Sequence, residues 1–224
     1  MGDKANEELA KLGQKSLETA EKAGGWIDDV FGNGIRHVAG AFEDSMAGFR
    51  MRNRAQVMEK TRKAIEKSGM VGNVRALDPR ISIPLFDAIS NESDDVLQRV
   101  WADYIRNAVD PKLPNPERVV IDVVRRLEPA DWPVLRVAFA HKTGELTAAN
   151  FDMEESALQA SLDRLHVLGL FEHNDGGLIF LLGGESDLSR KPLSITVDRS
   201  EYSATRLLRK LAVATSQWSD EHVS

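Results

Sequence analysis

Residues 81–137 constrain the fold most strongly, because they contain three helical blocks joined by turns that carry proline. In the middle block, the apolar residues recur at the spacing of a helix with one wide apolar face. These residues are Val96, Leu97, Val100, Trp101, Tyr104, Ile105 and Ala108. We therefore expect Trp101 and Tyr104 to lie in a core, and we expect this region to be a packed helical scaffold.

The ends of these blocks carry capping and stop signals. Residues 90–93 supply candidate N-caps for the middle helix, and Asp94 and Asp95 place negative charge on its first turn, where the helix dipole favours it. Pro111 ends the helix, because proline disfavours helical geometry in the residue before it. Asn115-Pro116 predicts the start of the next helix, with a cap followed by proline at the first helical position.

The same region resembles the Abi-alpha family, bacterial proteins grouped with abortive-infection defence against phage. The matching motifs are Ile83-Pro84-Leu85, Trp101-Ala102 and Leu127-Glu128-Pro129, within a stretch of about residues 51–171. The resemblance implies a role in phage defence in which the protein acts by binding. The family's motifs are structural, and none of them assigns a catalytic residue to this chain.

Composition narrows the class of protein further. The chain has 224 residues, which suits one large domain or two small ones, and its net charge of −6 does not favour nucleic acid or anionic membrane as a general partner. Cysteine is absent, which excludes disulfides, thiolate catalysis and cysteine metal sites. The polar start is not a signal peptide, and no apolar run approaches the roughly 20 residues of a spanning helix. We expect a cytoplasmic protein.

The element pattern predicts a mainly α protein whose C-terminal part is a small winged-helix-like α+β unit with a β-hairpin. We divide it into an N-terminal helical arm (1–70), a central helical segment (71–128), the winged-helix-like unit (129–200), and a C-terminal helix and tail (201–224). The winged-helix assignment rests on three expected helices followed by a hairpin. The last helix is expected from Glu201 to about Gln217.

Within the winged-helix-like unit, helices are predicted over 130–141, 145–150 and 154–168. Strands are predicted over 170–173 and 178–182, because the Asn-Asp-Gly-Gly turn at 174–177 is a strong hairpin signal. Residues 193–197 alternate in polarity and could add a third strand. The unit should therefore contain a short helical bundle packed on a small sheet.

A helical apolar pattern in residues 26–49 is interrupted by four glycines, Gly32, Gly34, Gly40 and Gly48. Each glycine costs about 1 kcal/mol in a helix relative to alanine, and close approach of another helix is a reason to keep it. We therefore predict self-association through Trp26, Phe31, Gly34, Val38 and Phe42. Membrane binding is the alternative, but the polar face is mainly acidic, whereas interfacial helices usually present Lys and Arg.

The helix that follows, residues 50–67, is strongly basic. Seven cationic residues stand against Glu59 and Glu66, and they are Arg50, Arg52, Arg54, Lys60, Arg62, Lys63 and Lys67. We single out Arg50, Arg52, Arg54, Arg62 and Lys63 as candidates for binding an acidic protein partner or nucleic acid. A solvated helix face that balances acidic surfaces elsewhere is the alternative interpretation.

The charges of the winged-helix-like unit argue against DNA readout. Between residues 140 and 175 the only cations are Lys142 and Arg164, against seven acidic residues. A recognition helix approaches phosphates with its N-terminal end, and here that end carries Glu154 and Glu155. We interpret this unit as a packing or protein-binding module.

Enzymatic interpretations find little support in the sequence. The five histidines lack a metal-ligand spacing, and no phosphate loop or nucleophile elbow is present. We therefore predict no catalytic residue, no cofactor and no metal site. The leading hypothesis is a non-enzymatic interaction protein that binds a second copy or another protein. A nucleic-acid-binding regulator acting through residues 50–67 and a membrane-acting effector acting through residues 26–49 are the alternatives.

Overall fold

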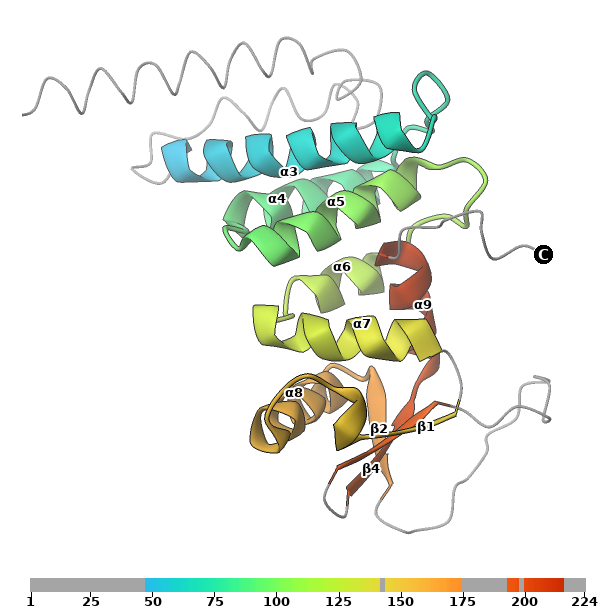
Figure 1. Ribbon diagram of the computed structural model, residues 1–224. Coiled ribbons are helices and arrows are strands. Elements are labelled where there is room, and N and C mark those ends of the chain that lie inside the picture. Colours follow the sequence, from blue (N-terminus) through green and yellow to red (C-terminus); the bar gives the residue numbers. More distant parts are fainter. Residues whose placement is uncertain (1–46, 142–143, 175–192, 198–199, 216–224) are drawn as a thin grey trace, which may run out of the picture. The chain divides into compact units, whose positions relative to one another are not determined.

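Two units, Met1–Arg125 and Arg126–Ser224, make up the chain in a computed structural model (Figure 1). The structure describes residues 47–141, 144–174, 193–197 and 200–215. In this described part the first unit is helical, and the second combines helices with a small mixed sheet. The prediction of a mainly α protein with a small α+β unit toward its C-terminus is confirmed.

The first unit is built on a long helix that packs across two shorter ones. Helix α3 (Ala47–Lys67) contacts both α4 (Pro79–Asn91) and α5 (Asp95–Val109), and α4 also contacts α6 (Arg118–Val124) (Figure 1). Helix α3 ends at Lys67 and is followed by Ser68 and Gly69, and the φ of 70° at Gly69 is readily adopted only by glycine. The predicted end of the basic helix at Ser68-Gly69 is therefore confirmed.

The core of this unit contains the apolar face predicted for residues 96–108. Trp101 and Tyr104 are each 1% exposed, and their rings meet edge to face with centroids 6.0 Å apart. Val57 and Ile65 of α3 are buried too, and they come from the helix that covers α5. The core position of both aromatic residues is confirmed.

The N-cap of α5 is Asp94, and not one of residues 90–93. The Asp94 carboxylate accepts hydrogen bonds from the backbone N–H groups of Val96 and Leu97, at 2.8 and 3.1 Å. Ser90 and Asn91 instead donate to backbone carbonyls four residues earlier, within the last turn of α4. Of the four expected caps, Ser90 and Asn91 therefore belong to the preceding helix.

Helix α6 also begins later than Asn115-Pro116 predicts, with Glu117 as its N-cap residue. The reason lies in Arg75, whose guanidinium donates to the Asn115 side chain at 3.0 Å and to the carbonyls of Leu113 and Pro114. The same side chain donates to a carbonyl at the end of α5, at Ala108. Asn115 is thus bound by a residue far away in sequence and does not cap a helix.

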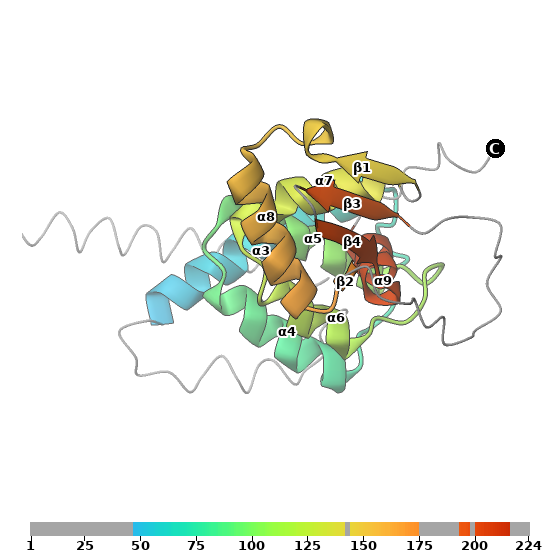
Figure 2. The same ribbon diagram turned by 90° about the horizontal axis from the view of Figure 1, so that it is seen from below.

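The second unit alternates short helices and strands along the chain. Its elements are η1 (Pro129–Asp131), α7 (Trp132–His141), β1 (Glu145–Thr147), η2 (Ala148–Asn150), α8 (Glu155–Val167), β2 (Phe171–Asn174), β3 (Ser194–Val197), β4 (Ser200–Ala204) and α9 (Arg206–Thr215). The strand order is β1-β3-β4-β2, with β1 parallel to β3 and the other neighbours antiparallel (Figure 2).

The sheet confirms two predicted strands and contains a hairpin that the sequence did not predict. Strands β2 and β3 occupy the segments predicted at 170–173 and 193–197, but the hairpin within the described residues joins β3 to β4. Strand β2 pairs with β4. The expected partner strand at 178–182 and most of its turn lie outside the described residues.

One helix prediction in this unit is wrong, and the last helix begins later than predicted. Residues 200–204 form a strand, and helix α9 begins only at Arg206, because Tyr202 is 1% exposed and pairs with Ile195 on one side and His173 on the other. Residues 145–150 split into β1 and the short η2, since Leu146 alone is buried in β1 and aligns with Ile195. Backbone pairing overrode helix propensity at both places.

A buried carboxylate links η1 to α8. Asp131 is 0% exposed and accepts hydrogen bonds from Arg164 Nη2 at 2.7 Å, from Arg164 Nε at 3.1 Å and from the Glu128 backbone N–H at 2.9 Å. The hydrogen bond to Asp131 raises the pKa of the Arg164 guanidinium. A buried charge is tolerated only when it is paired and hydrogen-bonded in this way.

Asp131→Ala should therefore destabilise the second unit. We expect a loss of about 2–3 kcal/mol in its unfolding free energy, because Arg164 is left without its buried partner. Urea unfolding followed by circular dichroism measures the change. Glu128→Gln is the matched control, because Glu128 lies 3.6 Å from Arg164 and its side chain is 60% exposed. An equal loss in both variants would contradict a special role for the buried carboxylate.

Candidate interaction surfaces

The candidate cations of α3 occupy different sides of the helix, and Arg54 faces inward. Its guanidinium lies 4.2 Å from the centroid of the Phe86 ring in α4, and its Nε donates to Ser90 Oγ at 2.5 Å. Burial lowers the pKa of this guanidinium. Arg54 therefore helps to hold α3 on α4.

Arg62 and Lys63 are neutralised on their own helix. Arg62 donates to Glu59 at 2.8 Å and to Glu66 at 2.5 Å, and Lys63 lies 3.4 Å from Glu59. The bond from Arg62 lowers the pKa of Glu59, and the bond to Glu59 raises that of Arg62. Two cations face two carboxylates here, so this part of α3 offers no excess positive charge.

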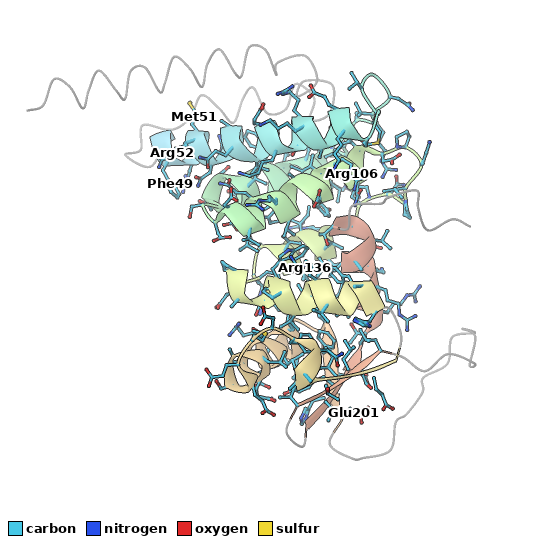
Figure 3. All side chains as sticks on the ribbon, in the orientation of Figure 1. Phe49, Met51, Arg52, Arg106, Arg136 and Glu201 are labelled. Carbon is cyan, nitrogen blue, oxygen red and sulfur yellow. The ribbon has the colours of Figure 1, made fainter. Side chains whose placement is uncertain are left out.

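Arg50 and Arg52 lie in the first turns of α3, and their contacts differ from those of the other candidate cations. Arg50 is half-buried, and Arg52 is exposed with its guanidinium 5.8 Å from the centroid of the Phe49 ring. Figure 3 shows Phe49, Met51 and Arg52 together at this end of the helix. Within the described residues, no carboxylate pairs with Arg52. Of the five candidates, Arg52 is the best placed to meet a partner.

The side of α3 turned away from α4 and α5, here called the outer face, has two unlike halves. The first half consists of Gly48, Met51, Arg52 and Ala55, and the second of Glu59, Arg62, Lys63 and Glu66. Met51 is 52% exposed and projects away from the neighbouring helices (Figure 3). A Cβ added at Gly48 would meet no atom within 4 Å. The first half is therefore an open, largely apolar surface, whereas the second is a balanced set of ion pairs.

The sequence predicted helix α8 as the counterpart of a recognition helix, but its charges do not suit phosphate. Its exposed side carries Ser156, Ala160, Asp163 and Val167, the last of them 71% exposed. Its one arginine, Arg164, binds Asp131. Each phosphate contact needs a cation, so these charges favour the interpretation of this unit as a packing or protein-binding module.

A polar and aromatic cluster joins α8 to the sheet. Tyr202 Oη donates to Asp163 at 2.6 Å and accepts from Gln159, and burial raises the pKa of Tyr202 to about 12. The His173 ring lies 5.0 Å from that of Tyr202 and 6.3 Å from that of His166. Among the described side chains, no three His, Cys, Asp or Glu residues are placed to hold a metal ion. The cluster serves to fix α8 on β4.

Asp103 on α5 is an ionisable group that sequence reasoning missed. Burial raises its pKa to about 6, and this effect outweighs the opposing influence of Arg106 and Lys67. Its position in the sequence, inside an amphipathic helix, carries no signal of this burial, because the burial depends on how α5 packs in the folded chain.

The self-association residues Trp26, Phe31, Gly34, Val38 and Phe42 lie outside the described residues, as does most of the segment proposed to act on membranes. None of the described helices is long and apolar enough to cross a membrane.

Comparison with known proteins identifies no relative. No family model, no curated protein and no solved structure matches the chain. The function must therefore be inferred from the surfaces themselves.

Asp103→Asn should make stability less dependent on pH. The folded-state pKa of about 6 lies above the ordinary 3.8, so the stability contributed by Asp103 is present below about pH 4 and is lost as pH rises through 6. The asparagine variant should be more stable than the parent at pH 8, by up to about 3 kcal/mol, and similar to it at pH 4. Urea unfolding at both values measures this. The exposed Asp122→Asn serves as control, and equal pH profiles for parent and Asp103→Asn would contradict the assignment.

Proposed function

We propose that the chain is a non-enzymatic interaction protein that associates with a second copy or another protein through the open half of the outer face of α3. The proposal rests on the contrast between the two halves of that face. Ion pairs satisfy the second half, whereas Met51 and Arg52 in the first half are exposed on a helix whose opposite side packs on α4 and α5. An exposed apolar residue beside an arginine is a composition favoured at protein interfaces.

The contacts of two buried ionisable groups in the second unit, Asp131 and Tyr202, support a binding role over a catalytic one. Asp131 is held by Arg164, and Tyr202 is held by Asp163 and Gln159. Each of these groups links two elements of the second unit, so their hydrogen-bonding capacity serves packing. The resemblance to the Abi-alpha family extends the proposal, since it implies that binding serves defence against phage, and we propose the cytoplasm as its location.

Self-association should be detectable by size-exclusion chromatography with light scattering. At tens of micromolar the parent chain should have a mass above the 24.8 kDa of one copy. Met51→Glu should shift the population toward the monomer, because it places a charge in the apolar contact. Glu66→Gln, in the second half of the same face, should have no such effect. A parent chain that is strictly monomeric would count against self-association.

Nucleic-acid binding is the competing function, and it rests on the exposed Arg52 and the half-buried Arg50. The other candidate cations of α3 are engaged by α4 or by carboxylates of their own helix. Each phosphate contact contributes about one unit to the salt dependence of binding. Two contacts give weak binding with a shallow dependence on salt.

Fluorescence anisotropy with a short labelled DNA duplex and a matching single strand tests this alternative. We expect no saturation at micromolar protein in physiological salt. Tight binding that weakens steeply with added salt and is abolished by Arg52→Glu, but not by Lys63→Glu, would overturn the expectation and favour a nucleic-acid-binding regulator.

A further inference from the structure

Two exposed arginines of helix α9 have no partner of opposite charge in the described structure. The helix carries three cations, Arg206, Arg209 and Lys210, and no acidic residue. Arg206 and Arg209 are exposed, and within the described residues neither side chain forms an ion pair or a hydrogen bond. This face of α9 is therefore a positively charged surface on a chain whose net charge is −6.

The start of α9 is fixed beside the C-terminal end of α8, which exposes an apolar residue. Thr205 directly precedes α9, and its hydroxyl donates to the Gly169 carbonyl in the turn after α8 at 2.7 Å. Val167 is the last residue of α8 and is 71% exposed. We call this surface, made of Val167, Arg206 and Arg209, the basic end. It combines an exposed aliphatic side chain with two cations that lack a partner.

The first turn of α8 has the complementary chemistry. Asp152 and Glu154 are exposed, and Met153 between them is half-buried. Glu154 is the N-cap residue of α8, but its side chain makes no capping hydrogen bond. None of the described cations pairs with either carboxylate. We call residues 152–154 the acidic end, and since α8 has 13 residues, it lies about 20 Å from the basic end.

We propose that the basic end of one copy binds the acidic end of a second copy, so that the second units associate head to tail along α8. This contact goes beyond the association proposed for α3, because it uses other residues in the other unit. The two surfaces in the contact are different, so it does not close on a two-fold axis. It generates a ring or an open chain of copies.

The chemistry of the two ends favours a second copy as the occupant. Within one copy they are held apart by α8, which Arg164 ties to the buried Asp131 at 2.7 Å. Between copies, two arginines meet two carboxylates, and Val167 meets Met153. Opposite charges around an apolar contact give an interface its specificity and its register. A phosphate backbone would satisfy the arginines but would offer no apolar surface to Val167.

Charge exchange in the full-length chain tests this contact, in a Met51→Glu background that removes the association proposed for α3. One variant adds Arg206→Glu and Arg209→Glu, and the other adds Asp152→Lys and Glu154→Lys. Sedimentation velocity at several hundred micromolar protein measures the mass. We expect the background to associate, each variant alone to sediment as one copy, and an equimolar mixture of the two variants to regain association. Raising the salt from about 0.1 M to about 1 M should weaken the association of the background, because the Debye length falls from ~10 Å to ~3 Å.

Matched controls reverse exposed charges elsewhere in the same unit, with Arg136→Glu in α7 and Glu172→Lys in β2. Neither should change the association of the Met51→Glu background. The neutral variant Arg206→Gln, Arg209→Gln provides a second test that introduces no new charge, and it should also lose association. Circular dichroism checks that every variant keeps the fold of the background.

Other outcomes overturn the inference in distinguishable ways. A Met51→Glu chain that stays monomeric would contradict the contact along α8, whereas the contact of α3 is judged from the unmodified chain. Loss of association in the arginine variant alone would give the basic end a different occupant. A mixture that stays dissociated would show that the two ends do not face each other. Saturable binding of a labelled DNA duplex that Arg206→Glu and Arg209→Glu abolish would assign the basic end to nucleic acid instead.

Discussion

The packing of α3 against the turn between α4 and α5 depends on a small set of hydrogen bonds. Gln98 is only 1% exposed, so its amide must be satisfied inside the protein. Its Nε2 donates to Gln56 Oε1 at 2.9 Å and to the Glu92 carbonyl, and its Oε1 accepts from Lys60 at 2.8 Å. The Asn53 side chain donates to the Ser90 carbonyl at 3.1 Å on the same side of α3. Because these bonds fix the rotation of α3 about its axis, they decide which residues form its outer face.

That rotation explains why the cationic side chains of residues 50–67 do not form a positively charged surface. Lys60 donates to Gln98, and its ammonium lies 3.1 Å from the carboxylate of Asp95 in α5. Arg54 donates to Ser90 of α4. Glu59 and Glu66 satisfy Arg62 and Lys63 from the same helix. Exposed ion pairs of this kind are worth little in stability, yet they remove the charges that a phosphate backbone would need.

The sequence predicted those parts of the fold whose cause is local. The apolar face around Trp101 and the glycine end of α3 follow from periodicity and backbone preference, and both are confirmed. Predictions failed where the deciding partner lies far along the chain, as with Asn115, which Arg75 binds, and Tyr202, which is paired with strands on both sides. The candidate site shows the same limit, since a count of charges on residues 50–67 could not reveal that α4 and α5 engage Arg54 and Lys60.

The remaining positive charge of α3 lies near Arg52, in the first half of the outer face. Arg52 lies over the Phe49 ring, and Arg54 contacts Phe86 and Ser90 of α4. Neither contact supplies negative charge. An anionic group that approaches Arg52 would therefore be attracted, whereas a cationic group would be repelled. For the association that we propose, this charge favours an acidic partner, and the neighbouring exposed Met51 favours a partner that also brings an apolar surface.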